Sequence, residues 1–229
     1  MTIVGFDTST AATSACVLRA DGETFEVSPQ PARLVERPGH SRELLPAIGE
    51  AMRQAEITWD DVTGIAVGIG PGTFTGLRIG IATARALATA RDLPVHPVSS
   101  LAVLAAGAAA SRDPRPATRD LPLIDARRGE VFGAVYRENT LLVDPFVGDP
   151  HELREKLGNA ARNALAIGDG SIRFRSVLEA DGVRVAPDGS ELHVVRGLHV
   201  CRLAVGVPAV APEAVLPTYL REPDAQPTQ

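Results

Sequence analysis

The sequence predicts an α/β protein made of two lobes, each a mixed β-sheet flanked by helices. Three observations support this fold class. Short apolar segments of strand length alternate with segments of helical periodicity, the same order of segments occurs twice, and a stretch rich in small residues and proline separates the two occurrences. With 229 residues and two distant cysteines, the chain can bury a core without disulfides.

The first half of the chain predicts the order βββαβαβ. An apolar strand ends at Asp7, and two strands joined by a turn at Asp21 and Gly22 follow it. Helical periodicity over 41–57 is followed by a strand at 62–70, a helix at 74–93 and a strand at 95–100. Pro46 falls just beyond the first turn of the first of these helices, where it has no N–H to donate and crowds the preceding turn. This helix is therefore expected to begin late or to kink.

The second half repeats this plan from residue 121. An apolar strand ends at Asp125, and two further strands follow it, the second at 140–148. A helix at 149–157, a strand at 163–170 and a helix at 171–181 complete the order. The segment 105–122, with Pro114 and Pro116, reads as a helix end and an exposed link between the halves.

Three antiparallel strands followed by helix, strand and helix form the ribonuclease-H-like unit. Two such units in tandem make the actin-like (ASKHA) architecture, in which ligands bind between the lobes. We therefore expect an N-terminal lobe over residues 1–100 and a C-terminal lobe over 101–189. The helical pattern at 198–206 predicts that the segment of about 190–225 returns to the first lobe.

Several turns in such a fold are candidates for the remnant of a nucleotide site. In an actin-like ATPase the turn after the first strand faces the nucleotide, and its Asp orients a magnesium ion. The candidate nucleotide-facing residues are Asp7, Thr8, Ser9, Thr10, Gly70, Gly72, Gly168 and Gly170. Asp, Ser and Thr also suit an ordinary turn for local hydrogen-bonding reasons, so the residues alone leave both interpretations open.

The glycine-rich stretch 68–80 matches neither phosphate-binding fingerprint. Gly70 and Gly76 lie one residue too far apart for a P-loop, and Leu77 and Arg78 stand where lysine and a hydroxyl residue are needed. The turn at 125–130 carries Asp125, Arg127, Arg128 and Glu130. It suits either phosphate or carboxylate binding or an ordinary exposed turn.

Small residues recur every four positions along the predicted helix 74–93, at Gly76, Gly80, Ala84 and Ala88. Residues four apart share one helix face, and glycine in a helix costs about 0.5–1 kcal/mol relative to alanine. Such a stripe is expected to receive another helix, either from the same lobe or from a second subunit. Under the second interpretation, Gly80→Glu abolishes pairing and leaves the monomer folded.

Composition and single motifs disfavour several other functions. The net charge of −5 argues against a broad basic face for nucleic acid. His40 is followed four residues later by Leu44, not by a second ligand, so we expect no metal site and no metalloprotease activity. A basic leader and an apolar run of about 20 residues are missing from the sequence, which predicts a cytoplasmic protein without membrane contact.

The segments "GFDTST", "HSRELLPAI", "GPGTFTGLRIGIATARALA", "DARRGEVF" and "PTYLREPDA" together resemble the TsaB (YeaZ) family of the bacterial tRNA threonylcarbamoyladenosine system. These motifs span most of the chain, but residues 150–210 match no motif. The resemblance implies an actin-like fold and a partner role without catalytic residues or cofactor. The related transferase TsaD holds metal through an HxxxH pair, which is reduced here to His40 and Leu44.

Members of the family pair through two N-lobe helices, as homodimers or with TsaD, and a small ATPase, TsaE, joins the assembly. The resemblance therefore implies contact with tRNA only through the complex. The implied interface residues are Leu44, Leu45, Ile48, Met52, Gly76, Leu77, Gly80, Ile81 and Ala84. The alternative from another class is an autonomous ATP-dependent phosphotransferase with Asp7 on magnesium.

Overall fold

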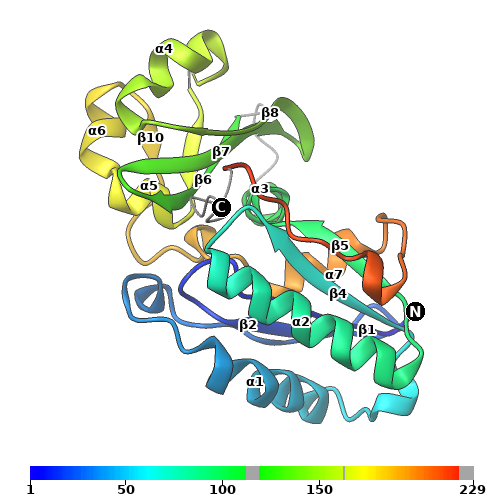
Figure 1. The fold of residues 1–229 in the computed structure, drawn as a ribbon. Helices are drawn as coiled ribbons and strands as arrows, with labels where there is room; N and C mark the ends of the chain where they lie inside the picture. The colour runs from blue at the N-terminus through cyan, green and yellow to red at the C-terminus, as the bar shows by residue number, and fades with distance from the viewer. Residues whose placement is uncertain (112–118, 162, 222–229) are drawn as a thin grey trace, which may run out of the picture.

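The computed structural model describes residues 1–111, 119–161 and 163–221, and it contains two five-stranded mixed sheets in two lobes (Figure 1). This architecture confirms the predicted fold class. Of the predicted helix end and link at 105–122, residues 112–118 lie outside the described residues.

The first sheet has the strand order β3-β2-β1-β4-β5. Its strands are β1 (Ile3–Asp7), β2 (Ser14–Leu18), β3 (Thr24–Val27), β4 (Gly64–Gly70) and β5 (Val95–Ser99). The first three pair antiparallel, and β4 and β5 add to β1 in parallel. Because β1 lies at the centre of the sheet, its end at Asp7 is enclosed by neighbouring elements.

The second sheet repeats this topology in the order β10-β9-β6-β7-β8. Its strands are β6 (Asp120–Arg127), β7 (Glu130–Arg137), β8 (Thr140–Gly148), β9 (Leu165–Ile167) and β10 (Arg184–Val185). Here too a three-stranded antiparallel meander is extended by two parallel strands beside its first strand. The corresponding ends of β1 and β6 carry Asp7 and Asp125.

Seven α-helices are present in the described parts of the chain. They are α1 (His40–Gln54), α2 (Phe74–Arg91), α3 (Ser100–Ala110), α4 (Leu153–Leu157), α5 (Asp169–Arg173), α6 (Arg175–Ala180) and α7 (Gly197–Ala204). The predicted helix over 171–181 is split at Phe174. Helix α1 runs through Pro46, whose side chain is exposed.

Both faces of the first sheet are buried, because alternate residues of each strand point to opposite sides. Val4 and Phe6 pack with α1 and α2, while Ile3 packs with α7 and α3 on the other face. Ile124 of β6 belongs to the same core cluster as Ile3, so the core continues from one lobe into the other. Figure 1 shows α3 near this junction.

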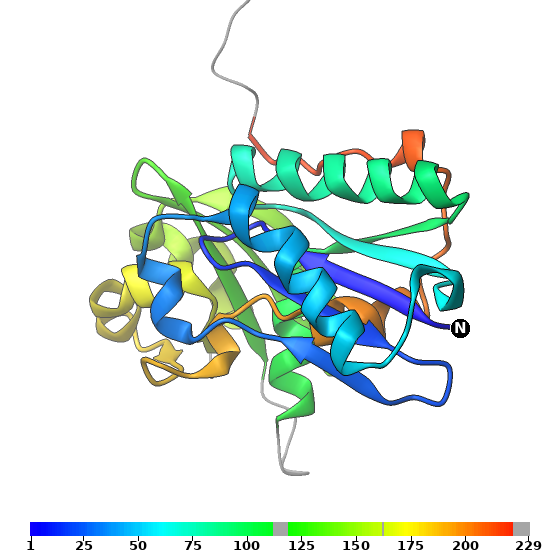
Figure 2. The same cartoon turned by 90° about the horizontal axis from the view of Figure 1, so that it is seen from below.

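The C-terminal segment 207–221 also bridges the two lobes. The amide of Val210 donates to the Val95 carbonyl (2.8 Å), and the amide of Thr218 donates to the Ile69 carbonyl (2.8 Å). Its last described residue, Arg221, donates to the carbonyl of Ala126 on β6 (3.1 Å). Figure 2 shows this segment running beside α2.

Candidate functional site

The turn after β1 is closed in by its own chain. Asp7, Thr8, Ser9 and Thr10 are each at most 1% exposed. The amide and hydroxyl of Ser9 donate to Asp7 Oδ1, both at 2.7 Å, and the Ser100 hydroxyl donates to Oδ2 at 3.2 Å. Burial raises the pKa of Asp7 to about 6. The expectation that this turn faces a nucleotide is therefore not matched by the geometry.

The glycine stripe of α2 packs against this turn. The hydroxyl of Thr8 donates to the carbonyl of Gly76 (2.7 Å), and a Cβ at position 76 would overlap the Thr8 carbonyl oxygen. A Cβ at Gly80 would overlap the Thr8 hydroxyl oxygen. The interpretation that these glycines make room for a second subunit is corrected by this contact, since the stripe is covered from within the lobe. Gly80→Glu is accordingly expected to disturb the monomer itself.

Most of the implied interface residues lie in the core of the first lobe. Leu44, Ile48, Met52, Gly76, Leu77, Gly80, Ile81 and Ala84 are all buried. Leu45, by contrast, is 60% exposed. The helices themselves lie side by side on one side of the sheet, as Figure 1 shows, so a different set of their residues faces outward.

We call that set the α1/α2 outer face. It consists of the exposed residues Leu45 and Gly49 of α1 and Ala82 and Ala86 of α2. A Cβ at Gly49 would meet no atom within 4 Å, so the described chain makes no use of the missing side chain. The outer face therefore combines one large apolar residue with small residues.

A cavity of about 620 Å³ lies between the lobes. Its walls come from the start of α2 (72–76), the end of β6 with the following turn (125–128), His40 and the C-terminal segment (218–221). Gly72 is the one candidate nucleotide-facing residue in this lining. A Cβ at Gly70 would lie 3.0 Å from the Thr218 carbonyl oxygen, so Gly70 admits the C-terminal segment.

The turn between β6 and β7 carries a group of charges at this cavity. Asp125 Oδ2 accepts from Arg127 Nη1 (3.0 Å) and from Arg173 Nη1 (2.9 Å). Asp169 lies beside it, accepts from the Asp125 amide, and has its pKa raised to about 6 by burial. Arg221 of the C-terminal segment forms an ion pair with Glu130 at the start of β7. Arg127 and Arg221 are lining residues of the cavity, whereas Arg173 holds Asp125 from α5 and is not part of the lining.

Gly168 and Gly170, predicted near an adenosine, instead make close backbone contacts with β6. A Cβ at Gly168 would overlap the Leu123 carbonyl oxygen, and one at Gly170 would lie 2.9 Å from the same atom. The carbonyl of Gly168 accepts from the Ser171 hydroxyl (2.7 Å) and faces His193 Nδ1 (3.0 Å). Both glycines therefore serve strand and helix packing in this structure.

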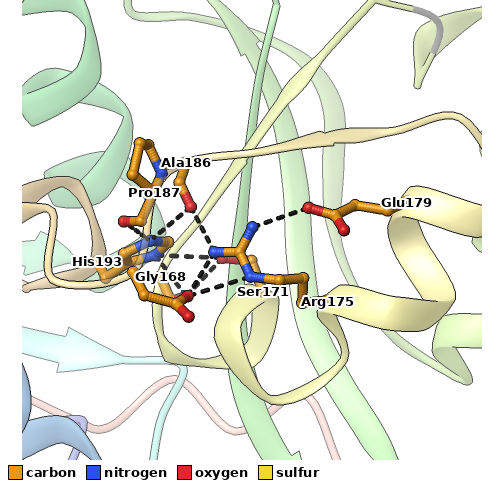
Figure 3. Close-up of polar contacts among 8 residues, drawn as sticks. Gly168, Ser171, Arg175, Glu179, Ala186, Pro187 and His193 are labelled. Atoms are coloured by element: carbon orange, nitrogen blue, oxygen red, sulfur yellow. Dashed lines mark hydrogen bonds and ion pairs between the residues drawn. The ribbon is translucent and has the colours of Figure 1, made fainter.

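Sequence reasoning missed the buried ring of His193, which Figure 3 places among backbone carbonyls. Its Nε2 lies 3.2 Å from the Ala186 carbonyl and 3.1 Å from the Pro187 carbonyl. Burial lowers the pKa of His193. These contacts connect the segment before α7 with the start of α5. The spacing of the histidines in the sequence did not indicate this role.

Sequence reasoning also missed the aromatic residues at the mouth of the cavity. Phe74 and Tyr219 stack with ring centroids 5.6 Å apart, and Arg78 lies 3.8 Å over the Phe74 ring. Tyr219 is far from Phe74 in sequence, so no local pattern could pair them. Within residues 1–111, 119–161 and 163–221, no group of three His, Cys, Asp or Glu side chains is arranged to hold a metal ion. None of the described helices has the length and apolarity needed to span a membrane.

The fold and its closed turn define an actin-like protein with two ribonuclease-H-like lobes. Comparison with known proteins identifies the family within this class. The family profile of TsaD, tRNA N6-adenosine threonylcarbamoyltransferase, matches residues 34–181. The TsaB protein of Haemophilus influenzae is 30% identical over 89% of this chain and 85% of its own length. This chain belongs to the TsaB (YeaZ) family.

Two further relatives extend this comparison. YeaZ from Pseudomonas aeruginosa superimposes with a TM-score of 0.79 and 29% identity, covering 96% of this chain and 99% of that one. An uncharacterized protein of Mycobacterium leprae is 31% identical over 98% of this chain, which spans 56% of the length of that relative. The H. influenzae relative is named a tRNA threonylcarbamoyladenosine biosynthesis protein.

Proposed function

We propose that this chain is a noncatalytic subunit of the tRNA threonylcarbamoyladenosine system that binds and activates a TsaD-like transferase through the α1/α2 outer face. The names of its relatives support the pathway. Its contact with tRNA then runs through the complex, which a TsaE-like ATPase joins. The same face also suits a homodimer in the absence of the transferase.

The proposed interface rests on one observation, the exposed and uncontacted glycine at position 49 of α1. Glycine within a helix costs about 0.5–1 kcal/mol relative to alanine, and the described chain packs nothing against this position. Leu45 lies one turn away on the same side and is 60% exposed. A partner helix that approaches the backbone at Gly49 and covers Leu45 would account for both features.

The geometry around Asp7 and position 44 supports a role without chemistry of its own. The carboxylate of Asp7 is enclosed by Ser9 and Ser100, where a phosphotransferase would need it open to magnesium. Leu44, which occupies the second position of the TsaD metal pair, packs in the core at 2% exposure. An autonomous ATP-dependent phosphotransferase is the competing function.

Reconstitution of tRNA modification from purified components tests the proposal. Omitting this chain is expected to abolish threonylcarbamoyladenosine formation, and Leu45→Glu is expected to weaken binding to the transferase by about tenfold or more. Val205→Glu is the matched control, because Val205 is equally exposed, at 63%, beyond the end of α7. Unchanged modification without this chain would refute the role, and equal effects of the two variants would refute the interface. ATP turnover by the isolated chain would favour the phosphotransferase.

A further inference from the structure

A second cavity, of about 580 Å³, lies between α3, α7 and the segment 190–194. Its volume falls within the range of roughly 300–1,000 Å³ that small-molecule sites occupy. Among the described residues, it shares no lining residue with the cavity of about 620 Å³, and none of its lining residues belongs to α1 or α2. The proposed function makes no use of this second cavity.

Two helices present one side each to the second cavity. Leu104 and Gly107 lie three residues apart on α3, and Leu198 and Arg202 lie four apart on α7, so each pair shares a side of its helix. A Cβ at Gly107 would lie 3.3 Å from both Cδ2 and Nε2 of His199. The ring of His199 therefore lies close against α3, at a position where α3 has no side chain.

His199 is a buried polar side chain that the described chain leaves without a partner. It is 6% exposed and lines the second cavity, and neither of its ring nitrogens makes a hydrogen bond to a described residue. The unpartnered Nε2 atoms of His40 and His96 are fully enclosed by the protein, whereas the ring nitrogens of His199 are not. Because a buried polar atom without a hydrogen bond is unfavourable, a ligand in the cavity that bonds to His199 gains free energy.

The ring of His199 is able to donate a hydrogen bond to an anion. Burial and the nearby charges of Arg196 and Arg202 lower the pKa of His199 to about 4, so the ring is neutral at pH 7. A neutral imidazole carries one N–H donor and one acceptor nitrogen. Since neither nitrogen is bonded within the described chain, either one can carry the hydrogen and turn it toward a ligand.

Arg202 supplies a positive charge that the described chain does not compensate. Its side chain is exposed and makes no hydrogen bond or ion pair with a described residue. Arg196, the other arginine of the lining, is paired with both Glu26 and Glu191. One uncompensated guanidinium matches one carboxylate, which it can hold through two parallel N–H···O bonds.

The apolar part of the lining is aliphatic. Leu104, Leu192, Val194 and Leu198 contribute to it, and the described lining contains no aromatic ring apart from the imidazole of His199. A hydrocarbon chain buried against such side chains contributes to binding in proportion to its area. A flat ring finds no aromatic side chain to stack on, so the cavity suits an aliphatic ligand.

We infer that this second cavity binds a small aliphatic carboxylate. The carboxylate accepts hydrogen bonds from the guanidinium of Arg202 and from the ring N–H of His199. The hydrocarbon chain lies against the aliphatic side chains of α3, α7 and the segment 190–194. Because the cavity is separate from the α1/α2 outer face, this inference goes beyond the proposed function and is tested independently of it.

Titration of the isolated, isotope-labelled chain tests the inference by NMR without any partner protein. The probes are hexanoate, its uncharged analogue hexanamide, and acetate, and the ring signals of His199 are identified by their loss in His199→Gln. A saturable shift of these signals is expected with hexanoate, and at least about tenfold weaker binding is expected with the other two probes. Equal binding of hexanamide would refute the role of the charge, equal binding of acetate would refute the aliphatic part, and no saturable shift with hexanoate would refute the site.

Arg202→Gln is the decisive variant. The side chain of Arg202 is exposed and unpartnered, so the variant should keep the thermal unfolding midpoint of the wild type while binding hexanoate at least about tenfold more weakly. Arg42→Gln is the matched control, because Arg42 is also exposed and unpartnered among the described residues but lies on α1. Equal affinity of the two variants for hexanoate would refute the assignment of Arg202. If no probe binds but Arg202→Gln weakens binding to the transferase, the cavity receives an acidic side chain of a partner and the small-molecule site is refuted.

Discussion

Thr8 and Gly76 are joined at the centre of the first lobe. The hydroxyl of Thr8 donates to the Gly76 carbonyl at 2.7 Å, and the backbone of Thr8 occupies the space that a side chain at position 76 would need. The end of β1 and the start of α2 can approach this closely because residue 76 has no Cβ. This contact explains why glycines stand in the first two turns of a helix.

Gly76→Ala is expected to destabilise the protein by roughly 1–3 kcal/mol, the usual cost of overpacking a core. The added methyl group overlaps a backbone atom, which cannot move aside as a flexible side chain would. Urea denaturation monitored by circular dichroism measures the change in the free energy of unfolding.

Gly49→Ala is the matched control in the neighbouring helix. A Cβ at Gly49 would meet no atom, so this variant is expected to gain about 0.5–1 kcal/mol in stability from helix propensity. Equal destabilisation by the two substitutions would show that close packing does not explain Gly76.

Gly80→Glu is expected to reduce the amount of folded monomer, because a side chain there would overlap the Thr8 hydroxyl oxygen within the lobe. Leu45→Glu, on the exposed side of α1, should keep the thermal unfolding midpoint of the wild type within a few degrees. Thermal scans of both variants provide the measurement. A stable, well-folded Gly80→Glu monomer would contradict the packing described here.

Asp7 is expected to make stability depend on pH. Its folded-state pKa of about 6 lies above the ordinary value of 3.8, so the folded state retains a proton that the unfolded state releases as the pH rises from about 4 to 6. The free energy of unfolding therefore falls across this window. Asp7→Asn removes that contribution, and its stability relative to the wild type should increase by roughly 2 kcal/mol between pH 4 and pH 7.5.

Denaturation curves of wild type and Asp7→Asn at several pH values measure this difference. The amide oxygen of asparagine can still accept from the Ser9 amide and hydroxyl, so the turn should keep its shape. A stability difference that stays constant from pH 4 to pH 7.5 would show that Asp7 does not titrate in this range.

His193→Ala is expected to destabilise the second lobe by roughly 2–4 kcal/mol. The substitution leaves a cavity and removes the ring from the carbonyls of Ala186 and Pro187 (Figure 3). His151→Ala, at an exposed position, should change stability by less than about 0.5 kcal/mol. Thermal or urea unfolding distinguishes the two, and similar values for both would contradict a structural role for the ring.

Sequence patterns predicted the elements well where their periodicity was strong. The strand ending at Asp7 and the helix beginning at Phe74 lie where expected, while the strand predicted to end at Asp125 continues to Arg127. The predicted helix over 171–181 is interrupted at Phe174, and the apolar pattern of this segment did not indicate that break. The α1/α2 pair was also found from sequence, but the side of α2 that is free was assigned incorrectly.

The sequence by itself determined the two-lobe fold, the family and the small-residue stripe of α2, because each depends on residues that are close together along the chain. Only the tertiary structure decided that Thr8 covers this stripe, that Gly49 faces outward, and that Tyr219 stacks on Phe74 at the start of α2. Periodicity shows which residues share a face. What packs against that face depends on contacts between residues far apart in sequence, and these form only in the folded chain.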